Sequence, residues 1–135
     1  MHTQKELRKA ILEIIDENQG LRGLSKQRLE EFRKSDSSAD PMSACYVSSN
    51  FPVTLMLAYK YADSLEKALL ASANAGGENV NRNALLGGIM GASTGMTKEV
   101  ERLLDGLVMK EDLIKEVEMF SNIQTPAEEK IKSEL

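Results

Sequence analysis

The chain has 135 residues and a mass of 14.9 kDa, the size of one folded domain. Its 41% hydrophobic and 28% charged residues exclude a disordered or fibrous protein. Its 17 basic side chains are outnumbered by 21 acidic ones and are not concentrated in one stretch, which excludes a typical nucleic-acid-binding protein. Cys45 is the only cysteine, so an internal disulfide framework is excluded and a reducing cytoplasm is the expected location.

No segment has the character of a membrane span or a secretion signal. Met1–Glu6 lead directly into an amphipathic pattern rather than into an apolar stretch. Of the longest uncharged segments, Pro41–Tyr59 is rich in Pro, Ser and Asn, and Asn83–Thr97 is short and rich in Gly. We therefore expect a soluble cytoplasmic protein that contacts neither membrane nor nucleic acid.

The N-terminal third predicts two amphipathic helices. In the first, over residues 4–18, apolar side chains recur at helical spacing: Leu7, Ala10, Ile11, Ile14 and Ile15. The second begins with Ser25 as its N-cap and runs to about Lys34. A polar loop, Ser35–Pro41, follows, because Ser and Asp compete for backbone hydrogen bonds and Pro41 bars its predecessor from helical geometry.

The middle of the chain predicts the buried centre. The apolar run Val53–Tyr59 is typical of a core helix, with Pro52 as its first residue because proline suits the first turn. The next helix is capped by Ser64 and ends at the glycine pair Gly76–Gly77. Residues 43–97 carry only three basic and three acidic side chains, as expected of a buried region.

A further helix, over about residues 81–93, is rich in small residues. Its glycines recur at every fourth position with small neighbours: Gly87, Gly91 and Gly95, flanked by Ala84, Gly88 and Ala92. Each Gly costs about 1 kcal/mol of helix propensity relative to Ala. We therefore expect close backbone approach to a neighbouring helix on this face, in preference to a ligand role.

The C-terminal third predicts more helices. One is capped by Thr97 and ends near Gly106, another begins at Glu111 or Asp112, and Pro126 opens a final short acidic helix. Because no strand pattern competes, the predicted fold is all-α, a compact bundle of about six to eight helices in a single domain. Its parts are residues 1–42 (amphipathic helices), 43–123 (the central segment) and 124–135 (an acidic tail).

Residues suited to catalysis are scarce. His2 is the only histidine, so a histidine-dependent base, triad or zinc site is excluded. Cys45 therefore has no histidine partner, and between Ala44 and Tyr46 it is interpreted as a small packing residue. No catalytic residue is predicted.

The segment Asn74–Arg82 stands between two apolar helices and offers the best candidate site. Free N–H groups and the positive dipole end of the following helix favour an anion such as phosphate. Glu78 could instead hold a divalent cation, with Asn79 or Asn81 as oxygen ligands. In the purely structural alternative, Asn74 and Asn79 are cap and turn residues and Glu78 favours the helix N-terminus.

Three segments in this order resemble the C-terminal part of the ADP-ribosylglycohydrolase family, and most of all its J1-crystallin and selenoprotein-J-like branch. They are Ala44–Pro52, Leu57–Asp63 and Ala75–Ala92, and the resemblance covers roughly residues 43–123. It implies an all-helical fold. In active members it implies hydrolysis of the glycosidic bond that joins ADP-ribose to a protein side chain, assisted by two magnesium ions.

Mapped onto the family's metal motif after the double glycine, Glu78 takes the place of the first aspartate, Val80 the second, and Asn81 the hydroxyl residue. Residues 1–42 resemble none of the family's N-terminal part, which carries its other metal motif. The resemblance thus implies a truncated domain, inactive alone, with magnesium binding weak or absent. Candidate residues for binding an ADP-ribose-like or phosphate ligand are Gly76, Gly77, Glu78, Asn79, Asn81 and Arg82, and the only candidate metal ligand is Glu78.

Two alternatives remain open at the sequence level. If part of a larger bundle is missing, exposed apolar surface could be covered by a second copy of the chain, which makes the protein a helical homo-oligomerisation module. The chain could instead be one subunit of a split hydrolase that is completed by a complementary helical chain.

Overall fold

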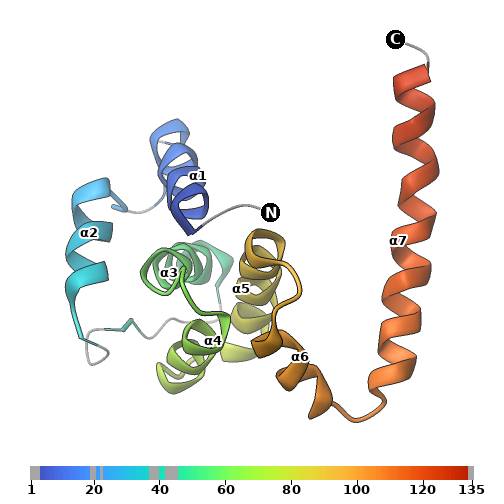
Figure 1. The fold of residues 1–135 in the computed structure, drawn as a ribbon. Helices are drawn as coiled ribbons and strands as arrows, with labels where there is room; N and C mark the ends of the chain where they lie inside the picture. Colours follow the sequence, from blue (N-terminus) through green and yellow to red (C-terminus); the bar gives the residue numbers. More distant parts are fainter. Residues whose placement is uncertain (1–3, 19–20, 22, 37–39, 42–45, 134–135) are drawn as a thin grey trace. The chain divides into compact units, whose positions relative to one another are not determined.

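The structure, a computed structural model, describes residues 4–18, 21, 23–36, 40–41 and 46–133, with side chains up to residue 122. Over these residues it has seven α-helices and no β-strand, which confirms the predicted all-α fold (Figure 1). The helices are α1 (Gln4–Glu17), α2 (Lys26–Lys34), α3 (Val47–Lys60), α4 (Leu65–Asn74), α5 (Asn79–Thr94), α6 (Lys98–Asp105) and α7 (Lys110–Ser133). The chain divides into two compact units, Met1–Val100 and Glu101–Leu135.

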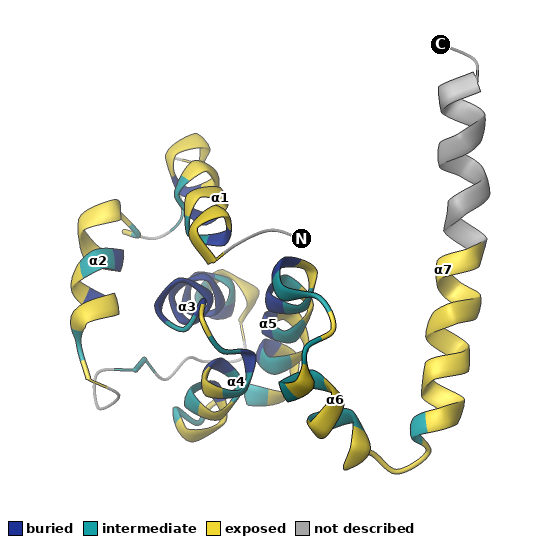
Figure 2. Ribbon diagram, in the orientation of Figure 1, coloured by how far each residue is buried: buried dark blue, intermediate teal, exposed yellow. Residues whose placement is uncertain are grey.

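Helix α3 forms the centre of the first unit, as predicted. It contacts α1, α2, α4 and α5, which surround it in Figure 1. Leu57 and Ala58 are fully buried, and every residue from Pro52 to Lys60 is buried. Figure 2 shows the same contrast between a buried α3 and outer helices that are buried on one side only. Burial on all sides accounts for the nearly continuous apolar sequence of this helix.

The outer helices α1, α2 and α4 follow their sequence patterns. Leu7, Ile11 and Ile15 of α1 form its buried stripe. Ser25 accepts a hydrogen bond from the backbone N–H of Arg28 at 3.2 Å, and Ser64 accepts one from that of Lys67 at 3.2 Å, so both predicted N-caps are confirmed.

The start of α3 differs from the prediction. The helix begins at Val47, five residues before Pro52, and Pro52 lies inside it. The backbone N–H groups of Ser49 and Asn50 both donate to the carbonyl of Tyr46, at 2.9 Å each, so the first turn closes upstream of the proline. Proline keeps the helical φ and removes only one hydrogen bond here, and the surrounding burial offsets that loss.

The small-residue face of α5 also differs from the prediction. A Cβ built on Gly87, Gly88 or Gly91 would have no neighbouring atom within 4 Å in the part of the chain that the structure describes. Gly95 lies beyond the helix as its C-cap, with φ 67°. The helix instead buries the opposite face, with Leu86 and Met90 fully buried, so the expected close approach of a neighbouring helix to the glycines is wrong for the described residues.

In the C-terminal part, the predicted cap of α6 is confirmed, because the hydroxyl of Thr97 accepts a hydrogen bond from the N–H of Val100 at 3.3 Å. The prediction of a separate helix opening at Pro126 is wrong. Helix α7 continues through position 126 as one helix, since a proline keeps helical φ and removes a single hydrogen bond. Residues 111–122 of α7 are exposed throughout (Figure 2).

None of the helices in the described ranges combines the length and the apolar character needed to cross a membrane.

Candidate functional site

The loop between α4 and α5 is shaped by two consecutive glycines in the left-handed region. Helix α4 ends at Asn74, and Gly76 and Gly77 have φ angles of 72° and 68°. Only glycine adopts two such conformations in succession without strain. The chain then re-enters a helix with Glu78 as its N-cap, and the N–H of Asn79 donates to the carbonyl of Gly77 at 3.0 Å.

Arg82 is buried within the first unit, and its side chain is hydrogen-bonded to this loop. Its side chain is fully buried, which sequence reasoning did not anticipate for a candidate ligand residue. The guanidinium donates to Ser72 Oγ at 2.8 Å, to the Ser72 carbonyl at 2.6 Å and to the Gly76 carbonyl at 2.7 Å. It thereby satisfies carbonyl groups at the C-terminus of α4, where a positive charge is also favoured by the helix dipole.

The charge of Arg82 is partly compensated from the loop itself. Burial lowers the pKa of the guanidinium, and the negative charge of Glu78 opposes that shift. Because an arginine stays protonated over all ordinary pH, the first turn of α5 carries a buried positive charge. That charge and the helix dipole have the same sign at this end of the helix.

The other candidate residues lie at the surface of the loop. Glu78 and Asn79 are half-buried, and Asn81 is exposed. Asn81 Nδ2 donates to Glu78 Oε1 at 3.3 Å, so these two candidates are brought together. Val80 is 73% exposed and turns an aliphatic side chain, which has no oxygen to offer a metal, to solvent.

This set of donors does not fit two divalent ions. Within the described residues, no group of three or more His, Cys, Asp or Glu side chains lies close enough to hold a metal. Glu78 is the single carboxylate of the loop, whereas magnesium takes an octahedron of oxygen ligands and a binuclear site needs several carboxylates. Backbone N–H groups are the other donors of the loop. The N–H of Asn79 is taken by the Gly77 carbonyl, whereas those that follow it in the first turn of α5 have no acceptor within the helix and no cap from the Glu78 side chain.

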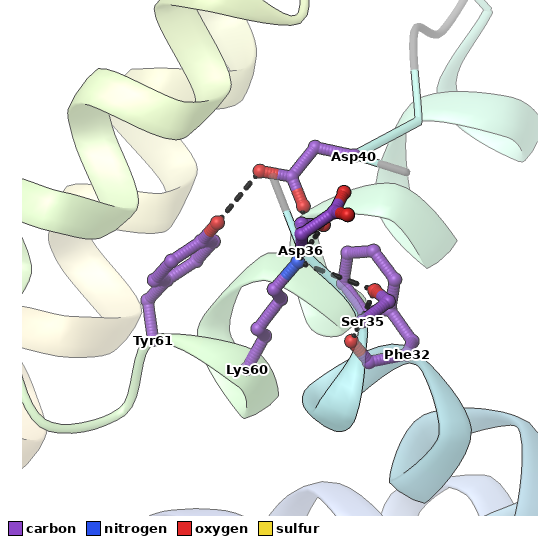
Figure 3. Close-up of polar contacts among 6 residues, drawn as sticks. All are labelled: Phe32, Ser35, Asp36, Asp40, Lys60 and Tyr61. Carbon is purple, nitrogen blue, oxygen red and sulfur yellow. Dashed lines mark hydrogen bonds and ion pairs between the residues drawn. The ribbon is translucent and has the colours of Figure 1, made fainter. Parts of the chain in front are cut away.

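A second polar cluster, the α3-end cluster of Ser35, Asp36, Asp40, Lys60 and Tyr61, was not anticipated from the sequence. Lys60 Nζ lies 2.6 Å from Asp40 Oδ1, donates to the Asp36 carbonyl at 2.9 Å and to Ser35 Oγ at 3.4 Å, and lies 4.4 Å from the centre of the Phe32 ring (Figure 3). Tyr61 donates to Asp40 Oδ2 at 2.7 Å. Burial and this hydrogen bond raise the pKa of the Tyr61 hydroxyl.

The α3-end cluster holds Ser35, Asp36 and Asp40 against the C-terminal end of α3. Lys60 makes a full set of contacts, so it is not available as a nucleophile or base. In the sequence, this cluster is marked only by Lys60, a charged residue at the end of an apolar helix, and by Asp40, the acidic residue before Pro41. That pairing spans 20 residues, and no local pattern connects the two.

Two residues considered at the sequence level, His2 and Cys45, lie outside the described residues.

Comparison with known proteins gives one family. The family model described as ADP-ribosylglycohydrolase matches residues 2–129. The match extends well beyond residues 43–123, so the expectation that residues 1–42 have no likeness to the family is wrong. No curated protein and no solved structure matches significantly. Because the match spans nearly the whole sequence and the fold is all-α, the chain belongs to the ADP-ribosylglycohydrolase family.

Proposed function

We propose that this protein is a non-catalytic member of the ADP-ribosylglycohydrolase family that binds the phosphates of an ADP-ribose-like ligand at the Gly76–Asn81 loop. We place it in the J1-crystallin and selenoprotein-J-like branch, in the cytoplasm, as a shortened form of the catalytic fold. One observation carries the binding proposal. Gly76 and Gly77, both with left-handed backbone conformations, lead into the N-terminus of the 16-residue helix α5, and the fully buried Arg82 supports this loop.

The lack of catalysis is inferred from the donor set of the same loop. A binuclear magnesium site positions and activates a water between two ions, and it needs carboxylates to neutralise their charge. This loop has Glu78 alone, with Val80 exposed where a second carboxylate would stand. Phosphate binding by backbone N–H groups does not depend on those carboxylates.

The direct test is calorimetric titration of the full chain with ADP-ribose, with and without magnesium. We expect a dissociation constant of about 1 mM or tighter, unchanged by magnesium. The variant Val80→Asp adds a negative charge in the first turn of α5, where it favours the helix but repels an anion. We expect it to weaken ADP-ribose binding by about fivefold.

Leu70→Asp is the matched control, because Leu70 is 55% exposed on α4 and the net charge changes by the same amount. Its affinity for ADP-ribose should stay at that of the parent chain. Absence of heat at millimolar ADP-ribose would contradict the binding proposal. Release of ADP-ribose from a modified protein by this chain plus magnesium would contradict the proposed lack of catalysis.

A second candidate function, self-association, is favoured by the exposed apolar residues that precede and begin α7. Between residues 107 and 120 the large exposed side chains are Leu107, Val108, Met109, Leu113, Ile114, Val117, Met119 and Phe120. An isolated helix is marginal in water, and most helices gain their stability by packing an apolar face. We therefore propose that a second copy of the chain covers this surface.

A further inference from the structure

A groove between α2 and α3 lies apart from the Gly76–Asn81 loop and shares no residue with it. Its volume is about 210 Å³. Its lining is largely apolar, with Leu24, Val53 and Met56 among the lining residues, and its polar lining residues are Arg28, Ser48 and Ser49. An apolar surface with a few convergent polar groups is the usual lining of a small-molecule site.

Arg28 brings a positive charge to this groove, and its contacts differ from those of the other arginine on α2. Arg28 Nη1 donates to the Gly23 carbonyl at 3.3 Å, and no carboxylate within the described residues pairs with it. Arg33, five residues later on the same helix, lies 2.9 Å from Glu30 instead. Arg28 therefore keeps most of its five N–H donors for another acceptor.

One wall of the groove is fixed by the α3-end cluster. Pro41 lines the groove, and its neighbour Asp40 is held by Lys60 at 2.6 Å and by Tyr61 at 2.7 Å. The side chains of Asp40 and Lys60 are 5% and 6% exposed, so water does not compete freely for this anchor. These contacts hold Asp40, the residue before Pro41, in place without a ligand, which lowers the entropy cost of binding.

We propose that this groove binds a small monocarboxylate with a compact apolar body. The single guanidinium matches the charge and the planar fork of a carboxylate, whereas a phosphate monoester would bring nearly twice that negative charge. The apolar body lies against Val53 and Met56, and the carboxylate pairs with Arg28. A volume of about 210 Å³ takes a chain such as that of hexanoate.

The test follows the methyl resonances of Val53 and Met56 by NMR while hexanoate is added to the full chain. Hexanoate should shift both residues with a dissociation constant of about 1 mM. Hexanol, which lacks the charge, and acetate, which lacks the apolar body, should each bind at least about tenfold more weakly. Binding of hexanol as tight as that of hexanoate, or no shift at either methyl, would overturn the proposal.

Two variants locate the site. Arg28→Met keeps the aliphatic stem and should weaken hexanoate binding by about tenfold, whereas Arg33→Met, outside the groove, should leave it unchanged. Ser48 lines the groove and is exposed, so Ser48→Leu should reduce the space for the ligand and weaken hexanoate binding. This second variant tests the site if Arg28→Met does not fold. Full affinity in a folded Arg28→Met or Ser48→Leu protein would overturn the assignment of the groove.

Discussion

Lys60 and Asp40 form an ion pair whose side chains are 6% and 5% exposed. Replacing Lys60 by Met leaves a buried carboxylate with Tyr61 as its remaining partner, and removal of one member of a buried pair costs about 3–5 kcal/mol. We expect the free energy of unfolding of Lys60→Met to fall by about that amount in urea denaturation, and the double variant Lys60→Met/Asp40→Asn to recover part of it.

The matched comparison is Lys110→Met. Its ammonium lies 2.6 Å from Asp105, the same distance, but the two side chains are 39% and 67% exposed. A surface pair is worth about 0–1 kcal/mol, so this variant should unfold almost as the parent does. Equal losses in the two variants would mean that burial does not determine the importance of Lys60.

Replacing glycines by alanine should have opposite effects on stability within helix α5 and in the loop before it. Alanine at Gly87 or Gly91 meets no atom within 4 Å in the described chain and removes backbone freedom from the unfolded state. Each substitution should therefore raise the free energy of unfolding by about 0.5–1 kcal/mol, measured by urea denaturation at low protein concentration. Destabilisation by either would show that something packs on this face.

Gly77→Ala is the counterpart in the loop before α5. Its φ of 68° places the new Cβ in the left-handed region, which costs about 1–2 kcal/mol. This variant should lose stability under the same conditions that favour Gly87→Ala and Gly91→Ala. A neutral result would show that the loop can rearrange, and it would weaken the case for a preformed anion site.

Self-association is a property of the whole molecule. If the exposed residues around α7 pack against a second copy, sedimentation should show dimers whose share rises with protein concentration at about 10–100 μM. Val117 and Phe120 are 65% and 62% exposed, so the double variant Val117→Glu/Phe120→Glu should remain folded and become monomeric. The double variant Leu70→Glu/Leu85→Glu, at positions 55% and 43% exposed, is the control for two added charges, and a parent chain that stays monomeric throughout would contradict this proposal.

Local patterns predicted most of the fold, and they singled out the Gly76–Asn81 loop as the candidate site. The apolar period of α1, the caps at Ser25 and Ser64 and the apolar run of α3 are all patterns of residues within a few turns of one another. The extension of α3 before Pro52 could not be predicted, because proline tolerates both a first turn and an interior position.

The unpredicted features depend on partners that only the folded chain brings together. Arg82 looks like a surface cation in sequence, yet its acceptors on Ser72 and Gly76 bury it. Lys60 likewise finds Asp40 across a polar loop. Glycine spacing on α5 suggested a tight helix contact, but spacing alone does not say which face of a helix meets the core.

Arg8 on α1 and Arg82 on α5 make hydrogen bonds that differ in the length of chain between donor and acceptor. Arg82 joins residues 6 and 10 positions away, whereas Arg8 Nε reaches the Tyr59 carbonyl, at 3.0 Å, across 51 positions. Loop-closure entropy grows with the logarithm of that separation, so the longer closure costs about 1.4 kcal/mol more than one of ten residues. The hydrogen bonds between α5 and the end of α4 therefore close much shorter segments of chain than the bond of Arg8 to α3, and their formation costs less conformational entropy.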